Sequence, residues 1–406
     1  MSLDVLVAGG ELEALVAALR LAEGGARVRV LAPGAGGLPH LAGGLGVLGP
    51  EELGTAALAA DPFALIAGLD PAHPLARVGA PAARAALAWF VGHLAAAGAP
   101  WASSRTNTPL LTMTGRAVPV LARPATMAPP PGPGDGPLAI ALFAGFDDLA
   151  GRLLASALRA GGHDAHAVAV AVPGFEGNAA ACAAALDGDA AAGALAERLR
   201  AALPAGIRTV LMPAVLGVDR HADVVARLEA VLGARVLEVP TLPPGAPGLR
   251  LWRTLVRSLE AKGAAVQTDA GPLRADLSGT RCDGLRDGAG ALHRADAFML
   301  ATGGVMAGGL EVDSHGRIAE PVLDVAVVQT DPLTQAGAEA VSAALERAGA
   351  SADERFRPTG AAGTLANVAA TGALLPGATP TAERSAEGIA VATAVAAADA
   401  LLDQAL

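Results

Sequence analysis

The 406-residue sequence predicts an α/β fold with an inserted second α/β domain. The first evidence is at the N-terminus, where apolar runs at 3–8 and 27–31 flank a helical pattern over 11–23. Two strands joined by one short helix pair in parallel through a right-handed crossover. This βαβ unit is typical of a Rossmann-like dinucleotide-binding fold.

Two proline-rich segments mark the limits of the insert. Residues 128–137 read APPPGPGDGP, and a second proline cluster covers 240–247. Neither favours regular structure, because proline lacks a backbone donor and glycine adds flexibility. Strand and helix patterns alternate between the two clusters. We therefore expect the first part of the Rossmann-like domain at 1–137, the inserted α/β domain at 138–245 and the second part of the Rossmann-like domain at 246–406.

Composition excludes several classes of protein. Hydrophobic residues make up 52% of the chain and charged residues 17%, which excludes a disordered chain. The net charge of -10 and the 2% of aromatic residues argue against nucleic-acid binding and against an electrostatic membrane anchor. The apolar stretch 388–398 is shorter than the roughly 18–20 residues of a membrane span. An acid at Asp4 is atypical of a signal peptide, so we expect a soluble, cytoplasmic protein.

The two cysteines exclude metal chemistry based on thiolate clusters. Cys182 and Cys282 stand a hundred residues apart and form no CxxC motif. A zinc site or an iron–sulfur cluster needs more thiolates at closer spacing. We expect two buried thiols and no metal site.

The turn after the first strand is the first candidate ligand site. A dinucleotide fingerprint uses one glycine for the tight turn, a second for approach to the diphosphate and a small third residue for packing. Gly9, Gly10 and Ala14 suit such a turn, but Glu11 stands at the second glycine position and places a negative charge at the helix N-terminus. Ala32 follows the second strand where an acid would bind ribose. These residues are compatible with two interpretations: a nucleotide-binding site, or a βαβ unit that binds no ligand.

Further glycine-rich segments could bring backbone close to a ring system. The segment 40–48 reads HLAGGLGVL, the strand 295–301 ends in Thr-Gly-Gly, and 367–373 forms another strand-to-glycine edge before a long helix. Ordinary loop packing is the alternative for each. The candidate cofactor-binding residues in these segments are Gly43, Gly44, Ala301, Thr302, Gly303, Gly304, Gly372 and Gly388.

Taken together, these segments resemble the B-subunit family of anaerobic glycerol-3-phosphate dehydrogenase, in the class related to fumarate reductase flavoproteins. The similarity runs over nearly the whole chain. Its motifs, in chain order, are Gly9-Gly10, HLAGGLGVL at 40–48, AHP at 72–74, MPAVLG at 212–217, LPPGAPGLRLWRTL at 242–255, LATGG at 300–304 with GGLEVDSHGRIAEPVLDV from 308, and NVAATGALLPGATPTAERSAEGIAVATAV from 367.

The resemblance implies a flavin cofactor, FMN by preference with FAD as the alternative. It implies oxidation of sn-glycerol 3-phosphate to dihydroxyacetone phosphate beside a catalytic flavoprotein, the A subunit, while an iron–sulfur, membrane-anchoring C subunit passes electrons to quinone. This would place the chain at the inner face of the cell membrane through its partners. FMN lacks the diphosphate and the adenosine ribose, so the missing glycine and the missing acid matter less. Ala373 departs from the family, since related flavoproteins often have aspartate there.

Substrate binding requires a cation for the phosphate, which arginine supplies through two hydrogen bonds. Arg250, Arg317 and Arg384 lie near the flavin-edge motifs and are the candidates, each with a surface ion pair as the alternative. The sequence identifies no catalytic base. Two other functions stay open: a non-catalytic interaction subunit that has lost its flavin, and an independent flavin dehydrogenase for another small hydroxy acid.

Overall fold

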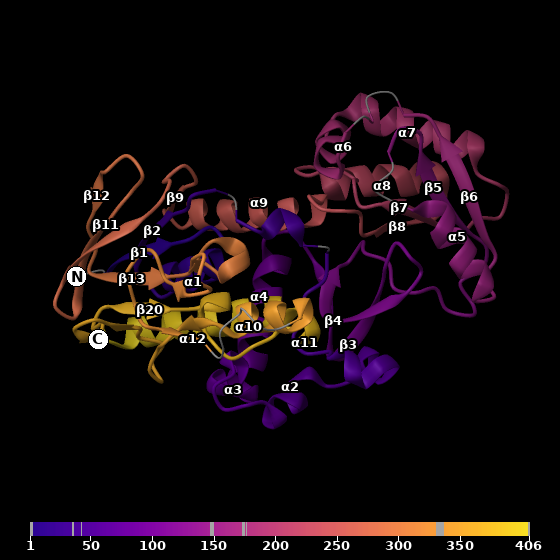
Figure 1. The fold of residues 1–406 in the computed structure, drawn as a ribbon. Helices are drawn as coiled ribbons and strands as arrows, with labels where there is room; N and C mark the ends of the chain where they lie inside the picture. Colours follow the sequence, from indigo (N-terminus) through magenta and orange to yellow (C-terminus); the bar gives the residue numbers. More distant parts are fainter. Residues whose placement is uncertain are drawn as a thin grey trace.

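The computed structural model describes the chain from residue 3 to residue 404, except for 35, 42, 147–149, 173, 174, 176 and 330–336. Figure 1 shows two sheet-centred bodies, with both termini beside the first sheet and the second sheet at the far end of the molecule. The predicted mixed α/β fold class is confirmed. The two bodies have separate hydrophobic cores.

The first body is built on a five-stranded, wholly parallel sheet with the order β20-β13-β1-β2-β9. Its strands are β1 (Asp4–Ala8), β2 (Arg27–Leu31), β9 (Ala265–Gln267), β13 (Ala297–Leu300) and β20 (Val368–Ala370). The predicted βαβ unit is present, with α1 (Leu12–Glu23) between β1 and β2. The central strand β1 has four consecutive buried residues, as expected for a strand covered on both faces.

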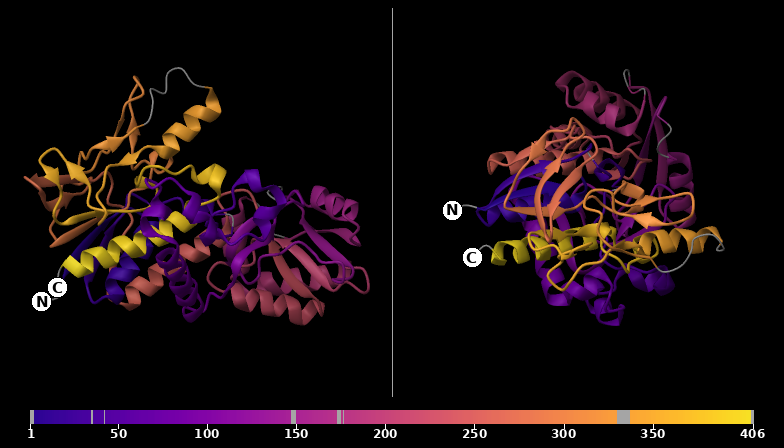
Figure 2. Two further views of the ribbon diagram at one scale, coloured as in Figure 1. Left: turned by 90° about the horizontal axis from the view of Figure 1, so that it is seen from below. Right: turned by 60° about the vertical axis from the view of Figure 1, so that its left-hand side comes forward.

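Helices α1, α12 (Ala386–Gln404), α9 (Ala246–Ala261) and α4 (Ala80–Ala96) form a layer in which α1 packs against α9 and α12, and α12 against α4. Figure 2 shows α12 running beside α4. The long helix predicted after the 367–373 edge is present as α12, but a separate short helix precedes it. Arg384 adopts a left-handed conformation (φ 52°), which ends α11 (Pro380–Glu383) before α12 begins.

The second body holds a four-stranded parallel sheet with the order β6-β5-β7-β8. Its strands are β5 (Leu138–Phe143), β6 (Ala165–Val170), β7 (Thr209–Pro213) and β8 (Arg235–Val239). Its helices are α5 (Gly151–Ala160), α6 (Ala179–Leu186), α7 (Asp189–Ala202) and α8 (His221–Leu232). The boundaries 138 and 245 of an inserted domain stay a prediction.

Antiparallel elements, which the sequence did not predict, complete the first body. The largest is the hairpin of β3 (Trp101–Leu111) and β4 (Ala117–Pro124). A meander comprises β10 (Arg274–Ser278), β11 (Arg281–Arg286) and β12 (Leu292–His293). The two-residue strands are β14 (Glu311–Val312), β15 (Ile318–Ala319), β16 (Val327–Val328), β17 (Gly349–Ala350), β18 (Thr359–Gly360) and β19 (Gly363–Thr364). The remaining helices are α2 (Pro62–Leu65), α3 (Pro74–Val78), α10 (Ala338–Arg347), η1 (Leu38–His40), η2 (Glu51–Leu58), η3 (Ile66–Gly68), η4 (Val305–Ala307) and η6 (Gly372–Leu374).

Within the described residues, no single helix has the length and apolar composition of a membrane span. Helices α6 and α7 meet these two criteria only as a pair, and the pair is bent by 101°.

Candidate functional site

A cavity of about 390 Å³ opens at the carboxyl end of the first sheet. It lies between the N-terminal turn of α1, the segment after β2 that contains η1, the segment after β13 that contains η4, and the first turns of α12. Open parallel sheets bind ligands at this edge, and the volume is in the range of small-molecule sites. We take this cavity as the candidate flavin site.

Close backbone packing brings the turn after β1 against the end of β13. A Cβ atom on Gly9 would lie 1.9 Å from the carbonyl oxygen of Ala301, and Gly9 has φ +132°. A Cβ on Gly10 would lie 2.5 Å from the carbonyl oxygen of Gly34. Only glycine fits these positions without backbone movement. The two predicted glycines therefore allow three chain segments to meet at one edge.

Glu11 is the residue at the N-terminal end of α1, and its carboxylate reaches across to the segment after β2. Its two carboxylate oxygens lie 2.9 and 2.8 Å from the backbone nitrogen of Gly37, which donates to them. Burial raises the pKa of Glu11, while the Gly37 hydrogen bond and the nearby His40 lower it. A carboxylate thus stands where a dinucleotide fold places a phosphate.

Glu13 lies deeper at the same helix end and is 5% exposed. Its Oε1 accepts a long hydrogen bond of 3.4 Å from the backbone N–H of Ala373. A Cβ on Gly372 would lie 2.2 Å from that oxygen, so glycine at 372 makes room for the carboxyl. Burial, and then the charge of Glu11, raises the pKa of Glu13 to about 8. Glu13 is therefore largely protonated at neutral pH.

The described lining of the cavity is apolar and acidic. Four glutamates contribute to it, together with His40, and none of the described lining residues is arginine or lysine. The acids are Glu11, Glu13, Glu346 and Glu387. Burial raises the pKa of Glu387, whose Oε2 accepts a hydrogen bond from the Gly46 backbone at 3.1 Å. This lining suits a neutral ring better than a phosphate.

The two parts of a flavin nucleotide therefore meet different surroundings. Small residues and backbone at Gly303, Gly304 and Ala373 leave room for a planar ring beside the sheet edge. At the end of α1, by contrast, any phosphate would face the carboxyls of Glu11 and Glu13. The residues fit the ring directly, and they fit a phosphate only where these carboxyls carry no charge.

The other predicted cofactor residues lie near the cavity or in its supporting shell. Gly303 and Gly304 line it, and Ala14 is buried in α1 behind it. The Thr302 hydroxyl is buried and has no hydrogen-bond partner among the described residues. The remaining three make close contacts with other parts of the first body: Gly43 with Met127, Gly44 with Val120, and Gly388 with Val47. Their assignment to the cofactor stays a prediction.

The three candidate substrate arginines lie apart, and none lines the cavity. Arg250 on α9 forms two hydrogen bonds, of 2.6 and 2.8 Å, with the carboxylate of Glu238 on β8. Arg317 is exposed at the turn between β14 and β15, and Arg384 is half-buried between α11 and α12. A role for any of them in substrate binding stays a prediction.

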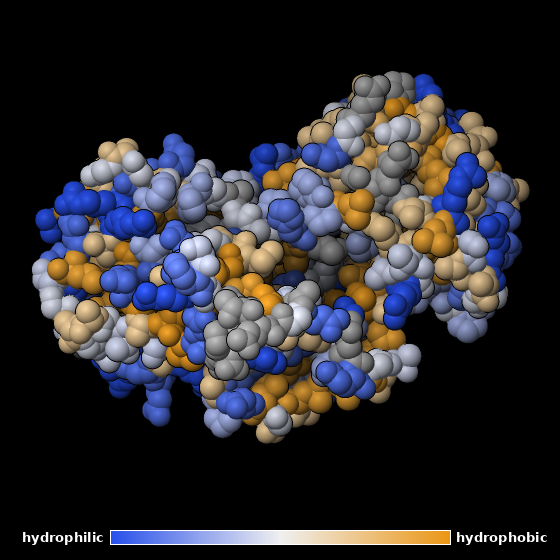
Figure 3. Space-filling view, in the orientation of Figure 1, coloured by the Kyte–Doolittle hydropathy of each residue, from blue (hydrophilic) through white to orange (hydrophobic). Residues whose placement is uncertain are grey.

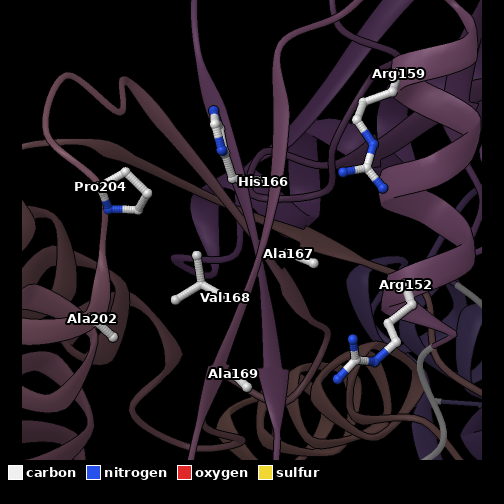
Figure 4. A pocket seen from close by; sticks show the side chains of 8 residues that line it. All are labelled: Arg152, Arg159, His166, Ala167, Val168, Ala169, Ala202 and Pro204. Atoms are coloured by element: carbon white, nitrogen blue, oxygen red, sulfur yellow. The ribbon is translucent and has the colours of Figure 1, made fainter.

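A second cavity, of about 540 Å³, adjoins the edge strand β6. Figure 4 shows Arg152 and Arg159 of α5 on one side of β6, and His166 and Val168 projecting on the other. The strand separates His166 from the two arginines and presents only Ala167 and Ala169 on their side. We do not take this cavity as the functional site.

Sequence reasoning missed several lining residues, and Glu13 is the most consequential. The signal in the sequence was a glutamate within the otherwise apolar first turns of α1. In the structure the residues on either side of it are buried. Helix α10 was missed as well, although Ser342, Leu345 and Glu346 form one wall of the cavity. No motif in the sequence connects α10 with the sheet edge.

Comparison with known proteins identifies the family of the chain. Residues 4–389 match the FAD binding domain family. The probable anaerobic glycerol-3-phosphate dehydrogenase B subunit of Halobacterium salinarum is 31% identical over 94% of this chain and 93% of its own length. The B subunit of the Pectobacterium atrosepticum enzyme is 30% identical over 94% of each chain. Among solved structures, glycine oxidase from Bacillus cereus is 12% identical, covers 100% of this chain and 96% of that chain, and has a TM-score of 0.35.

The chain is therefore a flavin-binding protein of the oxidoreductase class, with the FAD binding domain spanning most of its length. The predicted flavin cofactor is confirmed, and FAD, the alternative to FMN, is the flavin for which this domain family is named. Within that class, the chain belongs to the family of anaerobic glycerol-3-phosphate dehydrogenase B subunits. The predicted family resemblance is confirmed.

Proposed function

We propose that the chain is the flavin-dependent subunit of an enzyme complex that oxidises sn-glycerol 3-phosphate to dihydroxyacetone phosphate and delivers the electrons to quinone. A flavin supplies the acceptor for the hydride that leaves the substrate carbon. The cavity at the carboxyl edge of β1 and β13 is the observation that carries this proposal.

The charge of that cavity supports a partner that binds the substrate. Glycerol 3-phosphate is an anion and needs a cationic group, yet the described lining holds four glutamates and neither arginine nor lysine. We infer that the phosphate is bound mainly by another polypeptide, the A subunit in the family, and that this chain takes part in electron transfer. The relatives are subunits by name, which agrees with such a division of work.

The mouth of the cavity carries an apolar side chain that suits contact with a partner. Met306 lies on η4, lines the cavity and is 93% exposed. The hydropathy view shows apolar residues at the surface around the hollow between the two bodies (Figure 3). Exposed apolar surface beside a ligand site is a common feature of protein interfaces. An iron–sulfur C subunit would then connect the complex to the inner face of the membrane.

The test compares the isolated chain with the chain co-expressed with its A and C partners. We expect flavin absorbance in both preparations, and dye-linked oxidation of glycerol 3-phosphate only in the complex. Gly304→Val places a side chain against the Ala373 carbonyl, 3.0 Å from the Cβ position, and should lower the flavin content and the turnover of the complex. The control is Gly68→Val, where a Cβ meets nothing within 4 Å.

A non-catalytic interaction subunit is the second candidate, and Glu11 and Glu13 at the phosphate position favour it. On this hypothesis the chain associates with its partners but keeps no flavin. A colourless chain that gains no absorbance when mixed with flavin, in a complex whose turnover is unchanged by Gly304→Val, would replace the first proposal with this one.

A further inference from the structure

The N-terminus of α1 differs from a simple phosphate-binding helix end because two carboxyls of the chain already face it. Glu11 accepts from the Gly37 backbone, and Glu13 from the Ala373 backbone. A flavin phosphate that binds at the positive end of α1 would therefore lie close to both carboxyls. It would also meet their charge at short range in a poorly solvated site.

We propose that Glu11 and Glu13 determine the specificity of this site for the phosphate part of a flavin nucleotide: the phosphate is accepted only when both carboxyls are protonated, and a flavin without phosphate is bound regardless of their charge. This inference rests on the flavin-dependent function proposed above.

A protonated glutamic acid changes from a competitor into a partner for phosphate. It carries no charge, and its O–H can donate to a phosphate oxygen, whereas a carboxylate only accepts. Burial keeps Glu13 close to this neutral form, with a pKa of about 8, and raises the pKa of Glu11 in the same direction. Binding of a phosphate would stabilise the protonated forms further, so binding takes up protons where the free carboxyls are ionised.

Three other ionisable side chains face the pair across the cavity. His40 faces it from η1, Glu346 from α10 and Glu387 from α12. The segment of β13 and η4 contributes glycine, valine, methionine and alanine to the described lining, and the 372–373 turn contributes Ala373. The pair is therefore the part of the site where a change of protonation acts most directly on a phosphate.

The experiment measures the dissociation constants of FAD and of riboflavin for the full chain between pH 7 and pH 9, by flavin fluorescence. The FAD diphosphate is fully ionised in this range, as is the FMN phosphate, whose second pKa lies near 6. The pKa of Glu13, about 8, by itself makes FAD affinity about tenfold lower at pH 9 than at pH 7, so the loss should be at least about tenfold when Glu11 must also be protonated. Riboflavin affinity should stay unchanged. Equal FAD affinity at the two pH values, or an equal shift for riboflavin, would overturn the inference.

Two variants and a control assign the effect to the pair. Glu11→Gln/Glu13→Gln should bind FAD as tightly at pH 9 as at pH 7, while Glu260→Gln, an exposed glutamate on α9, should keep the wild-type dependence. Calorimetry of FAD binding in two buffers of different ionisation enthalpy should show proton uptake at pH 8.5 in the wild type and the control, and none in the double variant. A pH dependence that survives in the double variant would overturn the assignment to these residues.

The outcomes separate this inference from the proposed function. If the double variant does not fold, the comparison of FAD with riboflavin on the wild-type chain still decides the inference. Failure of both flavins to bind at any pH, to the chain and to its complex, would overturn the flavin-dependent function as well. Binding of FAD with no pH dependence would overturn the inference alone.

Discussion

Two glutamates, one in each sheet-bearing body, are buried and yet differ in charge at neutral pH. Glu13, at the carboxyl edge of the first sheet, has a pKa raised to about 8, chiefly by burial. Glu238, on β8 of the second sheet, has a pKa lowered to about 2: burial raises it, but the charges of Arg250 and His221 and the hydrogen bonds from Arg250 and the Leu216 backbone together lower it by more. The two carboxyls face similar desolvation, and the neighbouring guanidinium makes the difference.

The difference separates a structural site from a site that can respond to a ligand. The Glu238 carboxylate accepts hydrogen bonds from the Arg250 guanidinium and from the Leu216 backbone N–H at 3.0 Å. The Thr126 hydroxyl lies 3.2 Å away and can donate a further one. A carboxylate with this many donors has no capacity for a further ligand. Glu13 is instead neutralised by a bound proton. A ligand that binds beside it can favour either the protonated or the ionised form. A buried acid without a cation is therefore the better indicator of function.

The largest expected effect on stability comes from removing Arg250, the cation that pairs with Glu238. Arg250→Met leaves the Glu238 charge buried and uncompensated, which typically costs about 3–5 kcal/mol. The free energy of unfolding, from urea titration at pH 7, should fall by this amount. Glu238→Leu combined with Arg250→Met should recover most of the loss, since no buried charge remains.

The control for that change is an arginine on the same helix. Arg253→Met removes an ion pair with Asp219 in which both side chains are well exposed, so the loss should stay below about 1 kcal/mol. Equal losses for Arg250→Met and Arg253→Met would remove the contrast between the two buried glutamates.

The next effect in size concerns the unpaired site and has a defined sign with pH. The pKa of Glu13 is higher in the folded chain, about 8, than its ordinary value of 4.5. Its contribution to stability is therefore fully present below pH 4.5 and is lost as the pH rises to 8. Glu13→Gln has no such titration. Its free energy of unfolding should therefore rise by about 2.5 kcal/mol relative to that of the wild type between pH 5 and pH 7.

Urea unfolding of both proteins at pH 5, 6, 7 and 8 measures that relative gain. Glu260→Gln is the control and should stay parallel to the wild type at every pH. A difference between Glu13→Gln and the wild type that is constant with pH would mean that Glu13 has an ordinary pKa in the folded chain.

Much of the fold could be predicted from sequence because its parallel strands are short, apolar and bounded by turns. The predicted strand 27–31 coincides with β2, and the alternation of strands and helices predicted between the two proline clusters appears as β5 to β8 with their helices. Helix α12 was harder. Its start depends on the left-handed Arg384, a backbone conformation that no residue pattern at 380–388 announces. The β3–β4 hairpin mixes exposed and half-buried residues and gave no clear alternation.

Only part of the candidate site could be predicted from the sequence, and the physical reason differs from residue to residue. Gly9 and Gly304 were recognisable because close backbone approach at a sheet edge requires glycine, and Gly303 because the turn after the strand has a positive φ of 78°. The pairing of Arg250 with Glu238, twelve residues away, was not recognisable, since it depends on how α9 lies relative to β8 in the folded chain. The state of Glu13 likewise depends on desolvation by α12 and the 372–373 turn, distant in sequence.

The smallest expected effect tests how many donors the paired carboxylate needs. The Thr126 hydroxyl lies 3.2 Å from Oε2 of Glu238 and 3.0 Å from Nε2 of His221, so it can donate to either. Thr126→Val keeps the shape and removes this donor, while Arg250 and the Leu216 backbone remain. The loss should be about 1 kcal/mol in the free energy of unfolding and constant between pH 6 and pH 8. Thr114→Val, at an exposed position, is the matched control and should change stability by less than about 0.5 kcal/mol. A loss for Thr126→Val close to that of Arg250→Met would show that the hydroxyl, and not the guanidinium, decides the charge state of the buried pair.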